Sequence, residues 1–314
     1  YMNPYCPRWL ENHDNPSSWR YINRIPDEDL WHVHLALKRK LIDRIREYKR
    51  RDWANQQTHP GSVLAGGALL DPTVLTIGFA RRFTTYKRAG LIFSDPERLK
   101  SILNNPYKPV QIIFAGKAHP SDDEGKRIIQ SIYHRARQPE FGGRIAFVED
   151  YGEEIAKYLV HGVDVWLNNP LPPMEASGTS GMKAALNGVL NLSILDGWWL
   201  EGYNGRNGWA FGDGSSVSDR DAADAAAIYD ILEQQVVPRY YAVAGDGVPH
   251  EWVKMMKESI QSNCPAFSAR RMVKEYVARY YNPAMGCEER CGRGDAPSRA
   301  CESVKYAAGE PGYR

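Results

Sequence analysis

The chain has 314 residues, of which 43% are hydrophobic and 25% charged, the composition of a globular protein with one large or two modest domains. The formal net charge is only +2, from 40 Lys and Arg against 38 Asp and Glu, so we expect no nucleic-acid or membrane-surface role. No apolar run is long enough to span a bilayer and no charged-then-apolar leader opens the chain, which favours a cytoplasmic protein.

The first 72 residues predict one long helix between irregular segments. Residues 1–26 are polar and carry four prolines, which act as breakers. In the unit 27–72, apolar side chains recur every three or four residues from Asp27 to about Arg50. This pattern predicts a helix with Asp27 as its N-cap and a solvated face rich in Lys and Arg. The Gly-containing stretch 54–71 predicts a loop.

Five buried strand patterns alternate with helical patterns through the unit 73–240. The strands are expected at residues 73–79, 110–115, 144–148, 163–167 and 188–195. Repeated alternation of strand and helix is typical of a parallel sheet with right-handed crossovers. The sequence therefore predicts an α/β fold, with a Rossmann-like parallel sheet flanked by helices. A loop rich in Gly, Trp and Asn is expected after the fifth strand, at residues 196–214.

The end of the chain predicts helices and then a tail. Two amphipathic helices are expected within residues 241–282, and residues 283–314 have the composition of a disordered tail. Three of the five cysteines lie in this tail, separated by three and nine residues, with no histidine near them. That spacing is a poor zinc signature, so we expect no metal site.

Four cations follow the first strand pattern: Arg81, Arg82, Lys87 and Arg88. Ligands of open parallel sheets bind at the carboxyl ends of the strands. Cations crowded at one strand end repel one another unless an anion lies among them, so the cluster indicates a phosphate site. The alternative is a salt-bridged surface loop.

The stretch 175–188 reads EASGTSGMKAALNG and follows the fourth strand pattern. It predicts a loop that enters a helix, with Ser177 or Thr179 as the cap and Gly188 at the end. A helix start offers free N–H groups to an anion. Lys183 lies about one turn inside, where partial desolvation would lower its pKa and let its amine condense with an aldehyde. The alternative for Lys183 is a surface lysine.

This stretch resembles the pyridoxal-phosphate lysine segment of the glycogen and α-glucan phosphorylases, whose pattern is close to E-A-S-G-T-x-x-M-K-x-x-L-N-G. Every fixed position of the pattern is present. The run LDGWWLEGY that begins at Leu195 resembles the bacterial and archaeal α-glucan phosphorylases more than the animal enzymes. The segment GFARRFTTYKR, from Gly78 to Arg88, resembles the family's phosphate-binding segment.

The resemblance implies the C-terminal half of a two-domain GT-B-type glycosyltransferase fold, with residues 1–26 as an interdomain segment. It implies phosphorolysis of terminal α-1,4-linked glucose of a glucan to glucose 1-phosphate, with inorganic phosphate and with pyridoxal phosphate as cofactor. An N-terminal phosphorylase domain would be needed, so this chain alone is expected to be inactive. A homodimer is a further possibility that the resemblance raises.

The resemblance also assigns roles to individual residues. Lys183 would attach the cofactor and be essential to catalysis. The cofactor phosphate would be held by Thr179, Ser180 and Arg81, the last at a position where the family has a lysine. The attacking phosphate would be held by Arg82 and Lys87. The glucose hydroxyls would be held by Glu175, Ser177 and Gly178. Asn15 lies near the position of a family asparagine that contacts the sugar, but it is also a plausible turn residue.

Two other functions share this fold class. A sugar-nucleotide-dependent glycosyltransferase of the glycogen-synthase type would have no use for a lysine in this segment. A non-catalytic truncated domain is the second alternative. The aromatic residues of the expected loop, Trp198, Trp199, Tyr203 and Trp209, either stack on a glucan or form a packed lid.

Overall fold

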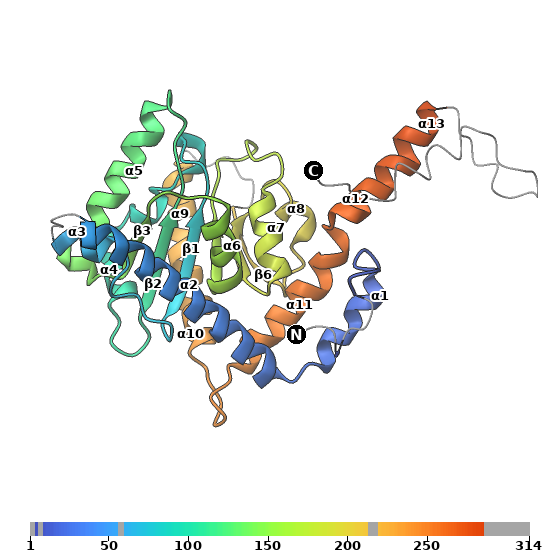
Figure 1. Cartoon of the computed structure of the whole chain (residues 1–314), viewed down its shortest axis with the longest axis horizontal. Coiled ribbons are helices and arrows are strands. Elements are labelled where there is room, and N and C mark those ends of the chain that lie inside the picture. Colours follow the sequence, from blue (N-terminus) through green and yellow to red (C-terminus); the bar gives the residue numbers. More distant parts are fainter. Residues whose placement is uncertain (1–3, 6–8, 56–59, 213–218, 286–314) are drawn as a thin grey trace, which may run out of the picture.

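The core of the molecule is a six-stranded sheet in which all paired strands run parallel (Figure 1). The computed structural model describes residues 4–5, 9–55, 60–212 and 219–285. The strands are β1 Leu75–Ala80, β2 Val110–Ala115, β3 Ile145–Val148, β4 Val165–Asn168, β5 Leu190–Ile194 and β6 Gly208–Phe211. Their order is β3-β2-β1-β4-β5-β6, so the strand order reverses between β1 and β4. The predicted Rossmann-like α/β class is confirmed.

Helices precede, connect and follow the strands. Before the sheet lie α1 Pro16–Trp19, α2 Asp27–Asn55 and α3 Pro60–Ala65. Between strands lie α4 Pro96–Leu103, α5 Asp123–Ala136, α6 Glu153–Gly162, α7 Thr179–Leu186 and α8 Trp199–Gly202. After the sheet lie α9 Arg220–Ile231, α10 Val237–Tyr240, α11 His250–Ala266, α12 Ala269–Tyr276 and α13 Asn282–Ala284. Within the described residues, none of these helices combines the length and apolarity needed to cross a membrane.

Successive residues of each strand enter opposite apolar layers, as the pleat of a strand requires. In β2, Ile112 and Phe114 pack in one layer and Ile113 and Ala115 in the other. Helices α4, α5 and α9 contribute to the first layer, and α6, α7 and the middle of α2 contribute to the second. Both faces are thus covered by helices, which explains why the strand patterns are continuously apolar.

Two loop predictions were wrong in part. The expected loop 54–71 contains α3, which begins at Pro60, where the proline fits the first turn of a helix. The expected loop 196–214 contains α8 and the sixth strand, β6. Four residues rich in Gly and aromatics carry too little periodicity to predict a strand. Backbone pairing with β5 and burial of Trp209 define β6 instead.

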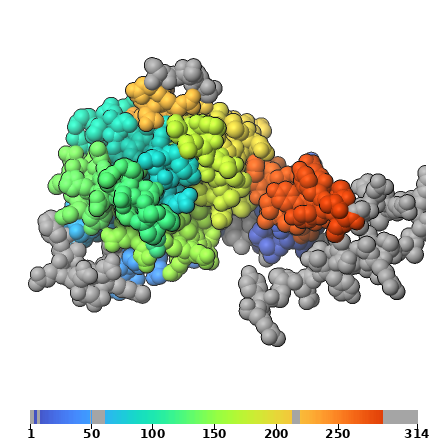
Figure 2. Space-filling model, turned by 90° about the horizontal axis from the view of Figure 1, so that it is seen from above, coloured from blue at the N-terminus to red at the C-terminus, as the bar shows by residue number. Residues whose placement is uncertain are grey.

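The helix predicted from Asp27 is confirmed. Asp27, expected as the N-cap, is its first residue, and the helix extends beyond the expected end near Arg50 to Asn55. The Asp27 carboxylate ties α2 to α11, lying 2.7 Å from Nδ1 of His250 and 2.5 Å from Nζ of Lys257. At the other end of α11, the N-terminal segment meets α12: Asp14 accepts a hydrogen bond from Lys274 at 2.5 Å. Figure 2 shows the described N-terminal segment, in blue, next to the C-terminal helices, in orange-red.

One residue of the face predicted to be solvated lies in the core. Lys38 is fully buried. Its Nζ donates to the Val74 carbonyl at 2.6 Å, to the Tyr240 hydroxyl at 2.9 Å and to the Asp164 carboxylate at 2.5 Å. The prediction failed here because Lys38 finds its partners on distant parts of the chain, which no helical periodicity reveals.

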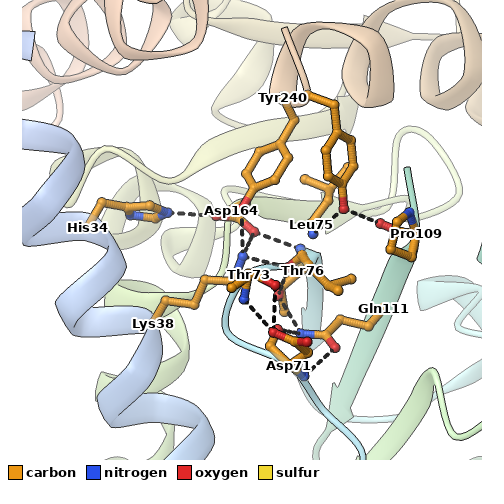
Figure 3. Close-up of polar contacts among 12 residues, drawn as sticks. His34, Lys38, Asp71, Thr73, Leu75, Thr76, Pro109, Gln111, Asp164 and Tyr240 are labelled. Carbon is orange, nitrogen blue, oxygen red and sulfur yellow. Dashed lines mark hydrogen bonds and ion pairs between the residues drawn. The ribbon is translucent and has the colours of Figure 1, made fainter. Parts of the chain in front are cut away.

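Asp164 is the centre of this buried network, which lies at the amino ends of β1 and β4 (Figure 3). Besides Lys38, its carboxylate accepts hydrogen bonds from Nε2 of His34 at 2.7 Å and from the backbone N–H of Thr76 at 2.7 Å. Burial raises the pKa of Asp164, but Lys38 and His34 outweigh burial, so the pKa lies below its ordinary value. The carboxylate therefore joins α2, β1 and β4.

We predict that Asp164→Asn lowers the free energy of unfolding by about 3–5 kcal/mol, because it leaves the buried Lys38 ammonium without its counter-charge. Urea unfolding followed by circular dichroism measures this change. The matched control is Arg44→Ala, which breaks the partly exposed Arg44–Glu154 pair and should cost less than about 1 kcal/mol. Equal losses in the two variants would show that the Asp164 network does not carry the stability we assign to it.

Candidate functional site

The site lies where the strand order reverses, at the carboxyl ends of β1 and β4. Arg81 directly follows β1, and Asn168 is the last residue of β4. In an open parallel sheet the connections leave a reversal point in opposite directions, and ligands bind in the resulting crevice. The predicted cation cluster begins at this point, and the stretch 175–188 follows β4 after residues 169–174.

Arg81 is a buried cation with unused hydrogen-bond donors. Its Nη2 donates to Oδ1 of Asn168, and its Nη1 lies 3.6 Å from the Glu175 carboxylate. Among the described residues, Nε and Nη1 have no hydrogen-bond partner. Burial lowers the pKa of Arg81 to about 10, although Glu175 opposes this shift. A desolvated guanidinium with free N–H groups is suited to bind an anion.

Lys87 and Glu175 form an ion pair within the same site. Both side chains are about 90% buried, with exposures of 10% and 11%. The backbone N–H of Glu175 donates to the Asp196 carboxylate at 3.0 Å, which fixes the start of the 175–188 stretch. The structure thus brings together Lys87, predicted to hold phosphate, and Glu175, predicted to hold the sugar.

Arg88 fixes the loop that carries Lys87, a role that sequence reasoning missed. Its guanidinium donates to the carbonyls of Asn169 and Pro170, each at 3.0 Å. It also pairs with Asp224 on α9 at 2.8 Å. The backbone of Arg88 has a φ of 48°, in the left-handed region that residues other than glycine rarely adopt. The partners come from distant segments, so no local pattern signals this function.

Helix α7 begins without a side-chain cap, contrary to the prediction that Ser177 or Thr179 caps it. Gly178 occupies the N-cap position, where it has no side chain to offer. The N–H of Gly181 donates to the Gly178 carbonyl at 3.1 Å, and no side chain caps the N–H groups of Thr179 and Ser180, which suits an anion at this helix start. A side chain at Gly181 would place its Cβ 2.7 Å from Asn191 and 2.8 Å from Trp198, so close packing of α7 requires a glycine here.

The predicted cofactor residues lie on or next to this helix start. Lys183 and Thr179 are exposed, and Ser177 and Ser180 are half-buried. The side-chain amine of Lys183 forms no hydrogen bond or ion pair with the part of the chain that the structure describes. Because the side chain is exposed, the expected desolvation is not present here. Thr179, Lys183 and Leu186, which lie on one side of α7, are all exposed. As predicted, the helix ends before Gly188, whose φ of 77° suits a glycine.

Two predicted residues lie apart from the buried cluster. Arg82 is exposed and makes no hydrogen bond or ion pair to any described residue. Asn15 caps α1 through its side-chain oxygen, which accepts from the N–H of Ser17 at 2.9 Å. Helix α1 packs against α11 and is not brought to the strand ends. The structure thus agrees with a turn role for Asn15.

The tryptophans of the 196–214 segment serve packing. Trp198, Trp199 and Trp209 are each at most 3% exposed. Trp198 packs edge-on against Phe267, with ring centroids 5.0 Å apart, and Trp199 donates its indole N–H to the Trp209 carbonyl at 3.1 Å. Of the two alternatives for these residues, the structure favours the packed one.

The structure is that of an α/β protein with a cluster of buried cations at the reversal point of a parallel sheet. A family model described as carbohydrate phosphorylase matches residues 37–213. The chain belongs to this family, as the resemblance in the sequence indicated.

Several curated relatives are similar over most of the chain. A glycogen phosphorylase of Aquifex aeolicus is 59% identical over 274 residues, covering 87% of this chain and 40% of the relative. A maltodextrin phosphorylase of Thermococcus litoralis is 50% identical over 281 residues, covering 88% and 32%. A glycogen phosphorylase of Mycobacterium tuberculosis is 42% identical over 291 residues, covering 89% and 34%. The chain therefore spans less than half the length of each of these relatives.

We predict that Arg88→Ala destabilises the protein more than Arg88→Gly. Both variants lose the guanidinium contacts, but only alanine must hold a φ of 48° against the steric clash of its Cβ. The difference in free energy of unfolding should be about 1 kcal/mol in favour of glycine, measured by urea unfolding. A control Arg82→Ala, at an exposed residue, should change stability by no more than about 0.5 kcal/mol. An alanine variant as stable as the glycine variant would contradict the backbone strain that we assign to Arg88.

Proposed function

We propose that this chain forms the phosphate- and cofactor-binding part of an α-glucan phosphorylase. The reaction is phosphorolysis of the terminal α-1,4-linked glucose of a glucan, such as glycogen, starch or maltodextrin, to glucose 1-phosphate. The observation that carries the proposal is the buried Arg81, whose Nε and Nη1 lack hydrogen-bond partners in the described part of the chain, beside the Lys87–Glu175 pair. The names of the relatives support the substrate and the reaction.

The residues at the strand ends fit pyridoxal phosphate. The free donors of Arg81 and the uncapped start of α7 suit a phosphate dianion, and the hydroxyls of Thr179 and Ser180 lie at that helix start. Lys183, one turn further along, would hold the cofactor through its amine. When bound, the cofactor supplies a phosphate that exchanges a proton with the substrate phosphate.

The attacking phosphate would be bound by Lys87 and by the flexible side chain of Arg82. A phosphate oxygen would replace Glu175 as the partner of Lys87, and the freed carboxylate would accept a hydrogen bond from a glucose hydroxyl. Ser177 and Gly178 would offer further polar groups to the sugar. Fixed cations around the phosphate would stabilise the charge that develops during transfer. The structure gives no support for Asn15 in this sugar site.

The chain spans only 40% of the Aquifex aeolicus relative, so we propose that full phosphorylase activity requires more than this chain. We propose that a further domain, as in the longer relatives, covers the exposed face of α7 and completes the glucan site. We also propose that the protein is cytoplasmic and forms a homodimer. Cell fractionation tests the location, and light scattering tests the dimer.

We predict that pyridoxal phosphate labels Lys183 in preference to other lysines. The protein is incubated with limiting cofactor and reduced with borohydride, and the modified lysines are quantified by peptide mass spectrometry. Lys183 should be labelled at least about tenfold more than Lys254, an exposed lysine on α11 with no phosphate site described near it. A Lys183→Arg variant should lose this selective label and keep the background.

Labelling of Lys183 no stronger than that of Lys254 would contradict the cofactor site. It would favour the sugar-nucleotide-dependent glycosyltransferase or the non-catalytic domain. Excess inorganic phosphate serves as a second control, because it should compete with the cofactor for the anion site and reduce only the selective label.

A further inference from the structure

A chain of buried hydrogen bonds leads from Arg81 into the sheet. The guanidinium Nη2 of Arg81 donates to Oδ1 of Asn168, and Nδ2 of Asn168 donates to Oγ of Ser193 at 2.9 Å. Ser193 in turn donates from Oγ to the carbonyl of Ile194 at 3.0 Å. Asn168 is 2% exposed and Ser193 is fully buried. The three side chains come from the ends of three neighbouring strands, β1, β4 and β5.

The chain of donors and acceptors has only one consistent direction. Ser193 uses its single hydrogen to reach the Ile194 carbonyl, so its oxygen must accept a hydrogen bond from Asn168. The amide NH₂ of Asn168 therefore faces Ser193, and the amide oxygen faces Arg81. A flipped amide would set its NH₂ group against the guanidinium, with donors facing donors.

The residue type at position 168 matters for the charge of the site. A neutral amide oxygen orients the Arg81 guanidinium and leaves its positive charge intact. A carboxylate in the same place would neutralise that charge in a buried setting and compete with any bound anion. The nearest described carboxylate, that of Glu175, lies 3.6 Å from Nη1 and is shared with Lys87. Nε and Nη1 remain without a hydrogen-bond partner among the described residues.

We propose that Asn168, held by Ser193, is a positioning residue that directs the Arg81 guanidinium toward the cofactor phosphate and preserves its charge for that phosphate. This inference rests on the proposed function, which identifies the anion as the phosphate of the cofactor. Asn168 touches neither cofactor nor substrate in this role and acts through Arg81.

The test compares pyridoxal phosphate with pyridoxal, which has the same aldehyde and ring but no phosphate. Both bind through Lys183, so the ratio of their dissociation constants isolates the contribution of the phosphate. Affinities are measured by the absorbance change on binding. We expect Asn168→Asp to weaken pyridoxal phosphate by about tenfold to a hundredfold and to leave pyridoxal within about twofold. Ser193→Ala should also weaken the binding of pyridoxal phosphate relative to pyridoxal, but by a smaller factor than Asn168→Asp.

The matched control is Gln111→Glu, which makes the same amide-to-acid change in a buried residue at the amino end of β2. Gln111 donates from Nε2 to the Asp71 carbonyl at 2.9 Å and to Thr76 Oγ1 at 2.8 Å (Figure 3). It lies at the amino ends of the strands, whereas Arg81 follows the carboxyl end of β1. This control should lower stability and leave the ratio unchanged. If Asn168→Asp fails to fold, Ser193→Ala provides the same measurement with a milder change.

Three outcomes are distinguishable. A loss confined to pyridoxal phosphate supports the positioning role. Equal losses for both ligands, or an unchanged ratio in both variants, overturn it and leave Asn168 a structural link between strands. A wild-type protein that binds pyridoxal as tightly as pyridoxal phosphate would instead overturn the proposed cofactor site itself. The ³¹P resonance of the bound cofactor gives a second measurement, because a carboxylate at position 168 should shift it toward the monoanion.

Discussion

The buried carboxylate of Asp164 is the interaction on which the geometry of the site depends. It precedes β4, and it accepts hydrogen bonds from the backbone of β1 and from two side chains of α2. These bonds hold β4 beside β1 at their amino ends, where the strand order reverses. Because parallel strands are stiff and in fixed register, the same contact sets which residues face each other at the carboxyl ends. At these carboxyl ends the guanidinium of Arg81 reaches the side chain of Asn168.

A buried cation lies at each end of the β1–β4 strand pair, and the two cations differ in how fully they are hydrogen-bonded. At the amino end, Lys38 is fully occupied by a carboxylate, a carbonyl and a hydroxyl. At the carboxyl end, Arg81 has a neutral partner and keeps unused donors. Burying an unsatisfied charge is costly, so a fold tolerates it where the surroundings are fixed by other contacts. The Asp164 network and the Arg88 contacts provide that fixed framework.

Sequence reasoning recovered five of the six strands and the major helices, because apolar periodicity is a local signal. It also selected Lys87 and Glu175, which the structure brings together. It missed β6, which lies in a stretch rich in Gly, Trp and Asn that is typical of a loop, and it placed Lys38 in solvent. It also missed the roles of Arg88 and Asn168. These residues act through partners on distant segments, and such pairings become visible only when the sheet brings the strand ends together.

The candidate site residues differ in burial: Arg81 is buried, whereas Lys183 is exposed. Groups at strand ends, such as Arg81, are desolvated by the helical layers that cover the sheet. Lys183 lies on the outer side of α7, a helix whose inner side packs through Gly181 on the sheet. A lysine there gains desolvation only from whatever covers that outer side. The sheet of this chain therefore positions the buried cations by itself, whereas the Lys183 amine is left exposed.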